Sequence, residues 1–260
     1  MSEPFDKLVR IMARLRAPDG CPWDREQTHK SLKPYLIEEA YETLEALDSG
    51  DDKEIRAELG DLLLQIVFHS QLATEEDRFT IDDVVNGICE KLIRRHTHVF
   101  GDVKATNHQE ALNNWEKVKR EERGGADTGA SILDGVPTSM PALLRARRLQ
   151  SKAKSVGFDW DSADGAFEKL DEEMAEFRAA FAAMDPKRLE DELGDIFFSL
   201  VNLSRFLKIN PEEALTGSIT KFISRFRYVE SGVARSGKQL DTVGLEEMDR
   251  LWEEAKKNGA

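Results

Sequence analysis

The residues best suited to chemistry are two sets of five carboxylates that share one spacing pattern. The first set consists of Glu38, Glu39, Glu42, Glu58 and Asp61, and the second of Glu172, Glu173, Glu176, Glu192 and Asp195. Each set spells E-E-x-x-E, a spacer and E-L-G-D, and each second member lies 134 positions after its counterpart. Carboxylate oxygens are ligands for hard divalent cations, and Mg²⁺ usually brings substrate phosphates with it. The two sets therefore predict two sites for divalent cations.

Two helices joined by a short turn would bring each set together. In the first set, the sequence predicts helices over about 31–47 and 52–75, separated by Ser49-Gly50 and capped by Asp51 or Asp52. Acids three or four positions apart lie on one helix face. The short turn makes the helices antiparallel neighbours, so their acidic faces meet. Without a cation, so many like charges would repel strongly.

The duplication extends beyond the carboxylates and divides the chain into homologous units. G-x-x-W-D begins at Gly20 and again at Gly157, and N-cap signals stand at Thr80 and Asn210. We expect an all-α protein with an N-terminal unit at 1–123, a flexible linker at 124–136 and a C-terminal unit at 137–260. Each unit is a bundle of about four main helices, and no segment predicts a strand. Further helices are predicted over about 4–16, 107–122, 141–154 and 244–257.

Basic and aromatic residues repeat as well. Lys91, Arg95 and Trp115 in the first unit correspond to Lys221, Arg225 and Trp252 in the second. Each Lys–Arg pair stands four positions apart on a helix and suits a triphosphate, because arginine offers phosphate a bidentate fork. The alternatives are surface cations paired with nearby acids, and tryptophans that pack in the core instead of stacking on a base. Lys169, at the position of Tyr35, gives the second unit one more cation near its acids.

The acidic pattern has other interpretations. A single E-E-x-x-E is commonly a solvated helix face, and a shared ancestor would leave the pattern in an inactive copy too. A carboxylate di-iron bundle uses Glu-x-x-His pairs, whereas all five histidines lie in the first unit. We therefore expect Mg²⁺ or Mn²⁺ rather than iron. His96 and His98 are either a ligand pair or surface and capping residues.

The composition argues against several classes of protein. The net charge of −13 is unlike that of a protein that binds nucleic acid directly, which normally has a basic face. No apolar run approaches the ~20 residues of a membrane span, and the first residues do not resemble a signal peptide. Cys21 and Cys89 share no short metal-binding spacing and are expected to be reduced thiols. Together these features predict a cytoplasmic protein that does not associate with membranes.

With these motifs, the sequence resembles the all-α nucleoside triphosphate pyrophosphohydrolases, whose signature is E-E-x-x-E followed by E-x-x-D. Two such units in about 260 residues resemble the MazG branch of that family, as do the G-C-P-W-D segment and the K-x-x-x-R-x-x-x-V segment. The resemblance covers nearly the whole chain. It implies a helical homodimer that hydrolyses nucleoside triphosphates to monophosphate and pyrophosphate with Mg²⁺.

The resemblance also implies roles for individual residues. The implied metal ligands are Glu39, Glu42, Glu58 and Asp61, and in the second unit Glu173, Glu176, Glu192 and Asp195. The implied nucleotide contacts are Lys221, Arg225 and Trp252, with Lys169 and the turn of Arg188, Leu189, Glu190 and Asp191 nearby. Lys91, Arg95 and Trp115 are their counterparts in the first unit.

One carboxylate of each set stays outside the implied metal ligands. This residue, Glu172 or Glu38, is the candidate that orients or deprotonates the attacking water. We expect the second unit to carry most of the activity, because it keeps every motif residue and adds Lys169. The alternative is a non-catalytic helical regulator that senses nucleotides or binds a protein partner. A phosphoribosyl-ATP pyrophosphohydrolase, an enzyme of a neighbouring class, would differ by its narrow substrate choice.

Overall fold

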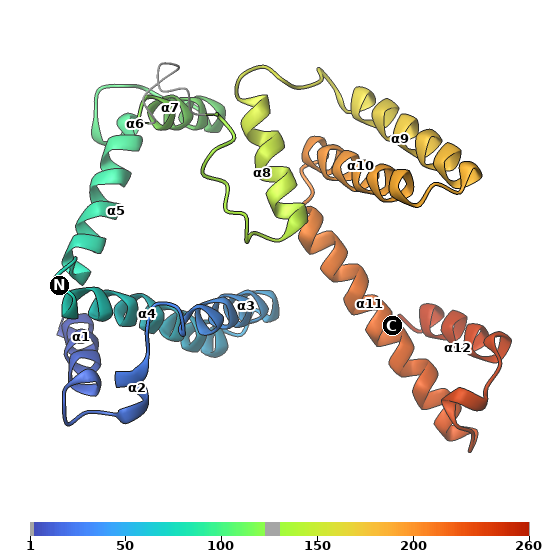
Figure 1. Ribbon diagram of the computed structural model, residues 1–260, viewed down its shortest axis with the longest axis horizontal. Coiled ribbons are helices and arrows are strands. Elements are labelled where there is room, and N and C mark those ends of the chain that lie inside the picture. The colour runs from blue at the N-terminus through green and yellow to red at the C-terminus, as the bar shows by residue number, and fades with distance from the viewer. Residues whose placement is uncertain (1–2, 123–130, 260) are drawn as a thin grey trace. The chain divides into compact units, whose positions relative to one another are not determined.

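The computed structural model describes residues 3–122 and 131–259, and within this part every regular element is a helix (Figure 1). The chain divides into two compact units, Met1–Thr128 and Gly129–Ala260. Their boundary falls within the linker predicted at 124–136, of which residues 124–130 lie outside the described residues. The expected all-α fold with two tandem helical units is confirmed.

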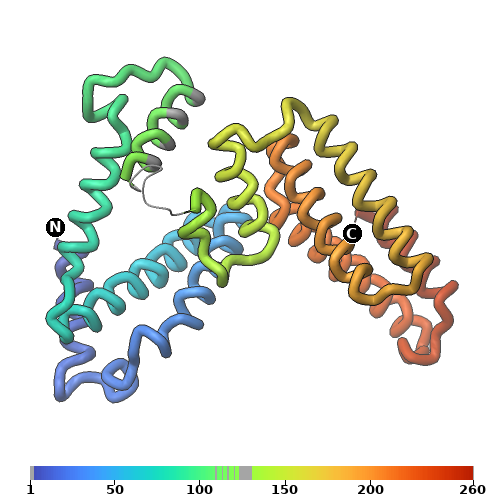
Figure 2. The backbone as a smooth tube through the Cα atoms, turned by 45° about the horizontal axis from the view of Figure 1, so that its top comes forward, coloured from blue at the N-terminus to red at the C-terminus, as the bar shows by residue number. Residues whose placement is uncertain are grey.

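The first unit is built around a helical hairpin. Helices α3 (Lys33–Ser49) and α4 (Asp52–Glu75) run side by side, as both views show (Figures 1 and 2). α1 packs on α4, and α5 continues from the end of α4 and contacts α7. The remaining bounds are α1 Glu3–Arg16, α2 Pro22–Glu26, α5 Ile81–Arg95, α6 Thr97–Phe100 and α7 His108–Glu121.

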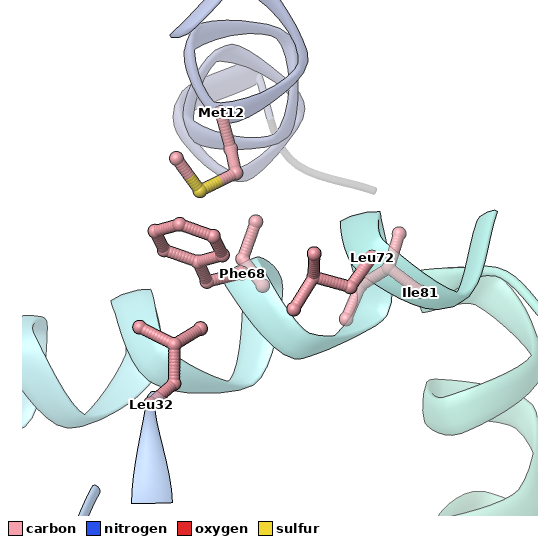
Figure 3. Close-up of a cluster of buried hydrophobic side chains, with 6 residues drawn as sticks. Met12, Leu32, Phe68, Leu72 and Ile81 are labelled. Carbon is pink, nitrogen blue, oxygen red and sulfur yellow. The ribbon is translucent and has the colours of Figure 1, made fainter. Parts of the chain in front are cut away.

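The core of the first unit fixes α4, which carries half of the predicted acidic site. Met12 of α1 lies over Phe68 of α4, while Leu32 approaches Phe68 from the opposite side (Figure 3). Leu72 and Ile81 continue the cluster toward α5. Burial of such side chains contributes about 1.5–3 kcal/mol each. The apolar end of α4 is thus anchored, while its acidic end extends along α3.

The second unit repeats the hairpin with α9 (Ala163–Ala183) and α10 (Pro186–Phe206). α8 (Ala142–Lys154) packs on α10 and on α11 (Pro211–Arg235), and α12 (Leu245–Lys257) packs on α11. A short 3₁₀ helix, η2 (Leu240–Thr242), leads into α12. α11 and α12 approach closely at Gly232, where an added Cβ atom would lie only 2.7 Å from the Leu251 side chain.

Local capping explains where the hairpin helices begin and end. α3 ends at Ser49, and Gly50 adopts the left-handed conformation at φ 71°. The Asp51 side chain accepts hydrogen bonds from the backbone N–H groups of Lys53 and Glu54, and Asp185 caps α10 in the same way. Such caps contribute about 1 kcal/mol each. The predicted turn and N-caps are confirmed, and Asp51 rather than Asp52 is the cap.

Other boundaries agree with the sequence within two residues, with a few additions. Thr80 and Asp83 form a reciprocal capping box at the start of α5, and Asn210 caps α11. The short helices α2 and α6 were not predicted, since each is too brief to show a hydrophobic period. Among the described residues, no helix is long and apolar enough to cross a membrane.

A histidine pair ties α4 to the loop before α3. The Nδ1 atoms of His29 and His69 lie 2.8 Å apart, their rings stack at 5.1 Å, and Arg78 contacts the far nitrogen of His29 at 2.5 Å. Burial, and then the neighbouring His29, lower the pKa of His69 below its usual 6.5. The folded unit therefore binds fewer protons here than the unfolded chain.

This pair should make the first unit sensitive to acid. The pKa of His69 is lower in the folded state than in the unfolded chain. Neutral His69 therefore contributes to the free energy of unfolding above about pH 6.5, and this contribution is lost as the pH falls below that value. We expect His69→Leu, which installs the residue found at the equivalent Leu203, to flatten the melting temperature between pH 7.5 and 5.5. His108→Gln, at an exposed histidine, should not. An unchanged slope in His69→Leu would contradict this account.

Candidate metal and nucleotide site

The acidic site of the second unit lies between α9 and α10. Carboxylate oxygens of Glu173, Glu176 and Glu192 all lie within 4.8 Å of one another. Glu173 and Glu192 are buried, at 5% and 8% exposure. Carboxylates are almost never buried unless paired or bound to a cation. This geometry and burial fit a small cation with oxygen ligands.

Mutual repulsion is visible in the protonation behaviour of these acids. The charge of Glu192, followed by burial, raises the pKa of Glu176. Burial, followed by the charges of Glu173 and Glu192, raises the pKa of Asp195. Asp195 therefore belongs to the same electrostatic cluster, although its oxygen lies outside the tight group of three. A divalent cation would relieve this repulsion.

Two cations of the chain itself partly balance the cluster. Lys169 Nζ lies 2.8 Å from carboxylate oxygens of both Glu172 and Glu173, and these contacts raise the lysine's pKa. Arg188 Nε lies 3.1 Å from Glu192. The sequence predicted that the turn of residues 188–191 lies near the nucleotide, and within this turn Arg188 contacts the acidic cluster. Leu189 is half-buried, and Glu190 and Asp191 are exposed. Lys169 is therefore positioned beside the acidic cluster.

The first unit repeats the acidic cluster in a more open form. Oxygens of Glu39, Glu58 and Asp61 lie within 4.8 Å of one another, but none of the three residues is buried. Burial, and then Asp61, raise the pKa of Glu39, while burial, and then Glu42, raise the pKa of Glu58. The charge of Glu42 contributes to both raised pKa values, so Glu42 belongs to the same electrostatic cluster. Glu38 is exposed beside the cluster.

Side chains that the sequence did not single out support the first cluster. The buried Gln65 donates from Nε2 to Glu39 at 3.4 Å, and its Oε1 has no partner among the described residues. The Thr43 hydroxyl donates to the Glu39 carbonyl at 2.7 Å. Gln65 follows Asp61 by four positions on the same face of α4, so helical spacing could have identified it.

The basic and aromatic candidates form a separate group on α11 and α12. The Arg225 guanidinium lies 5.8 Å from the Trp252 ring centre, and Phe222 lies 5.3 Å from the same ring. Trp252 also packs against the core cluster of Val229, Val233 and Leu251. Trp252 therefore packs in the core, whereas its stacking on a base stays a prediction. Lys221 is exposed on the same helix.

The structure brings the acids together and the cations together, but it does not join the two groups within a unit. α11 packs mainly on α8 and α12, and Figure 1 shows it diverging from the α9–α10 hairpin. In the first unit, α5 carries Lys91 and Arg95, and Arg95 lies 5.5 Å from Trp115 of α7. Lys91 is exposed.

The histidines do not add a metal site. His96 Nδ1 lies 2.7 Å from the Leu92 carbonyl at the end of α5, and the His96 and His98 rings are 5.7 Å apart. Across the described ranges, the groups of at least three potential ligands contain only glutamates and aspartates. The capping role is therefore the one that the contacts support. Cys21 and Cys89 are free thiols.

Divalent cations should stabilise the folded chain measurably. Removing the repulsion among buried acids stabilises the native state alone, by about 2.7 kcal/mol at a hundredfold excess over Kd. We expect Mg²⁺ to raise the melting temperature by about 5–10 °C relative to chelator. The shift should shrink as the pH falls from neutral, because the raised carboxyl pKa values let protons replace the cation. Identical melting curves with and without Mg²⁺ would count against the cluster as a cation site.

Known proteins share this sequence over nearly its full length. The MazG nucleotide pyrophosphohydrolase domain matches residues 27–100 and 163–229. The chain is 48% identical to the nucleoside triphosphate pyrophosphohydrolase/pyrophosphatase MazG of Thermotoga maritima, over 97% of this chain and 95% of that protein. It is 46% identical to the nucleoside triphosphate pyrophosphohydrolase of Escherichia coli K12, over 97% of each chain. With YabN of Bacillus subtilis the identity is 49%, over 97% of this chain and 51% of that protein. Both domain matches contain the acidic hairpins, and the chain therefore belongs to the MazG family of nucleotide pyrophosphohydrolases.

Proposed function

We propose that this protein is a Mg²⁺-dependent nucleoside triphosphate pyrophosphohydrolase that converts NTPs and dNTPs to monophosphate and pyrophosphate. The observation that carries the proposal is the cluster of Glu173, Glu176 and Glu192, in which Glu173 and Glu192 are buried, with Asp195 electrostatically coupled to it. The relatives' names supply the reaction, and Mn²⁺ is the second candidate cation because it also prefers oxygen ligands. Several bases and both sugars should be accepted, because the motif residues offer the base a stacking tryptophan but no set of base-specific hydrogen bonds.

The metal ligands in this proposal are the four acids of each hairpin. They are Glu173, Glu176, Glu192 and Asp195 in the second unit, and Glu39, Glu42, Glu58 and Asp61 in the first. When bound, Mg²⁺ would supply Lewis-acid polarisation of the phosphoryl oxygens. The carboxylates would hold the cation in place, and its positive charge would relieve the repulsion among them.

Other side chains handle the water and the leaving group. Glu172, outside the metal set but held by Lys169 at 2.8 Å, would orient the attacking water and accept its proton. The water oxygen would bond to the α-phosphorus, the bond from that phosphorus to the bridging α–β oxygen would break, and that oxygen would depart as part of pyrophosphate. Lys221 and Arg225 would neutralise the pyrophosphate, with Trp252 as a stacking surface for the base. Glu38 is the equivalent general base in the first unit.

The second unit should carry most of the activity. Glu173 and Glu192 of its cluster are buried, and two cations, Lys169 and Arg188, lie beside them. In the first unit, Tyr35 stands at the position equivalent to Lys169, and none of the clustered acids is buried. Burial strengthens electrostatic interactions with a bound cation and phosphate.

A second copy of the chain would complete each unit. The exposed apolar residues Leu193, Phe197 and Leu200 share one face of α10, as do Ile37, Tyr41 and Leu44 on α3. Apolar stripes of this size rarely remain exposed in a soluble monomer, and two helical hairpins can pair into a four-helix bundle. A homodimer would also supply an α11 to an acidic hairpin. Light scattering that gives a mass near 29.4 kDa rather than twice that value would oppose the dimer.

The rival proposal is a non-catalytic regulator that binds nucleotides or a protein partner. Retention of all five carboxylates in both units favours the enzyme. Pyrophosphate release from a mixture of nucleotides, measured with Mg²⁺ and again with chelator, separates the two. Release that requires Mg²⁺ supports the enzyme, and no release supports the regulator. A single accepted nucleotide would favour a narrow-specificity enzyme instead.

The cellular location in this proposal is the cytoplasm. Two free thiols favour a reducing compartment, because disulfides form mainly in oxidising ones. The acidic net charge of −13 opposes direct binding to nucleic acid, whereas a metal-bridged triphosphate can still be held.

A further inference from the structure

The phosphate-contact candidate of the first unit is held by a carboxylate of its own unit. Arg95 donates from Nε and from its terminal nitrogen to Glu122 Oε2, at 3.0 and 2.5 Å. Arg94 donates to the other oxygen of the same carboxylate at 2.7 Å. The Arg95 and Glu122 side chains are only 18% and 19% exposed. A phosphate reaching Arg95 would meet a guanidinium whose fork is already engaged.

The contact between an arginine and a tryptophan is common to both units. Each arginine, Arg95 and Arg225, lies within 6 Å of the ring centre of its tryptophan, at 5.5 and 5.8 Å. Counting from those tryptophans, Glu122 corresponds to Gly259, which has no side chain. Arg94 corresponds to Ser224. The first unit thus has a carboxylate and a second arginine at positions where the second unit has a glycine and a serine.

We propose that Glu122 is an internal competitor for phosphate, which lowers the affinity of the first unit for triphosphates by occupying the Arg95 guanidinium. This inference rests on the proposed function, because it assumes that Arg95 contacts the phosphates of the substrate. Removal of Glu122 then exposes a binding group that the first unit already contains.

The chemistry of the pair supports competition at all working pH values. The hydrogen bonds from Arg95 and Arg94 lower the pKa of Glu122 to about 2, so protonation does not release the arginine near neutrality. A phosphate oxygen and a carboxylate oxygen use the same bidentate geometry on guanidinium. A ligand must therefore displace Glu122, and part of its binding free energy is offset by the broken pair.

The test measures binding at the first unit within the full chain. Glu192→Gln and Asp195→Asn remove metal ligands of the second unit, and the probe is the non-hydrolysable α,β-methylene analogue of ATP with Mg²⁺. Adding Glu122→Gln should lower the calorimetric Kd about tenfold. Adding Arg95→Ala as well should abolish that gain. No gain from Glu122→Gln, or a gain that persists without Arg95, overturns the proposal.

Controls separate competition from a general charge effect. Glu121→Gln removes the same charge from the neighbouring exposed residue and should leave Kd unchanged, so an equal gain there contradicts the proposal. If Glu122→Gln lowers the melting temperature, Glu122→Asp keeps the charge but shortens its reach, and should give a similar gain. Failure of the proposed function itself would appear separately, as absence of analogue binding and of nucleotide hydrolysis in the unsubstituted chain.

Discussion

Glu173→Ala is expected to reduce nucleotide hydrolysis by about a thousandfold or more. Glu173 is the most buried acid of the second cluster, at 5% exposure, and its carboxylate is close to Glu176 and Glu192. A catalytic metal contributes several kcal/mol to transition-state stabilisation, and each 1.36 kcal/mol is a factor of ten in rate. Asp195→Ala should have a comparable effect. The measurement is kcat/KM for pyrophosphate release at saturating Mg²⁺.

The same substitution should stabilise the protein without Mg²⁺. Glu173 raises the pKa of both Glu176 and Asp195, so its removal relieves repulsion in the apo state. A higher melting temperature in chelator, together with lost activity, would show that the loss is not unfolding. Asp171→Asn, at an exposed acid of α9 outside the cluster, is the matched control and should retain activity.

The equivalent changes in the first unit test the inequality of the units. Glu39→Ala and Asp61→Ala should cost less activity than Glu173→Ala and Asp195→Ala. This follows because the acids of the first cluster are not buried, and the first unit has Tyr35 at the position of Lys169. Equal losses from both pairs would contradict the assignment and indicate that both units turn over or share one site.

Arg225→Ala should produce the second-largest loss, about a hundredfold in kcat/KM. Its guanidinium is the candidate that neutralises the departing pyrophosphate, and removal of one donor to developing charge costs about 10²–10³-fold. Product inhibition by pyrophosphate should weaken in parallel. Arg225→Lys should recover only part of the rate, since lysine lacks the bidentate fork.

Stability provides the control for Arg225. The side chain lies over Trp252, which packs on the α11–α12 core, so both the melting temperature and the helical circular dichroism must be compared. Arg227→Ala on the same helix is a matched change that removes one positive charge elsewhere and should retain activity. Loss of activity with unchanged pyrophosphate inhibition would argue that Arg225 supports the helices instead of the leaving group.

Local sequence signals predicted the hairpins because they determine helix ends directly. Gly50 occupies the left-handed turn position that glycine tolerates, and Asp51 and Asp185 occupy N-cap positions that their side chains favour. The acidic clusters follow from those turns, since a short connection makes the flanking helices antiparallel. The spacing of Glu39, Glu58 and Asp61 is therefore sufficient to predict that they lie together.

Contacts between distant segments could not be predicted in this way. Glu122 reaches Arg95 only because α5 and α7 pack together, and their separation in sequence exceeds any helical period. The His29–His69 contact similarly joins a loop to α4. The divergence of α11 from the α9–α10 hairpin depends on packing with α8 and α12. These features are tertiary, and the propensities of individual segments carry no signal for them.

The most direct test of the account is the identity of the initial products. The chain would be incubated with Mg²⁺ and ATP, and the nucleotides and phosphates separated by ion exchange before secondary reactions occur. The acidic cluster with a two-phosphate leaving group predicts AMP and pyrophosphate in equal amounts, and a rate of formation of both that is about a thousandfold lower with Glu173→Ala. ADP and orthophosphate as the initial products would contradict cleavage between the α- and β-phosphates.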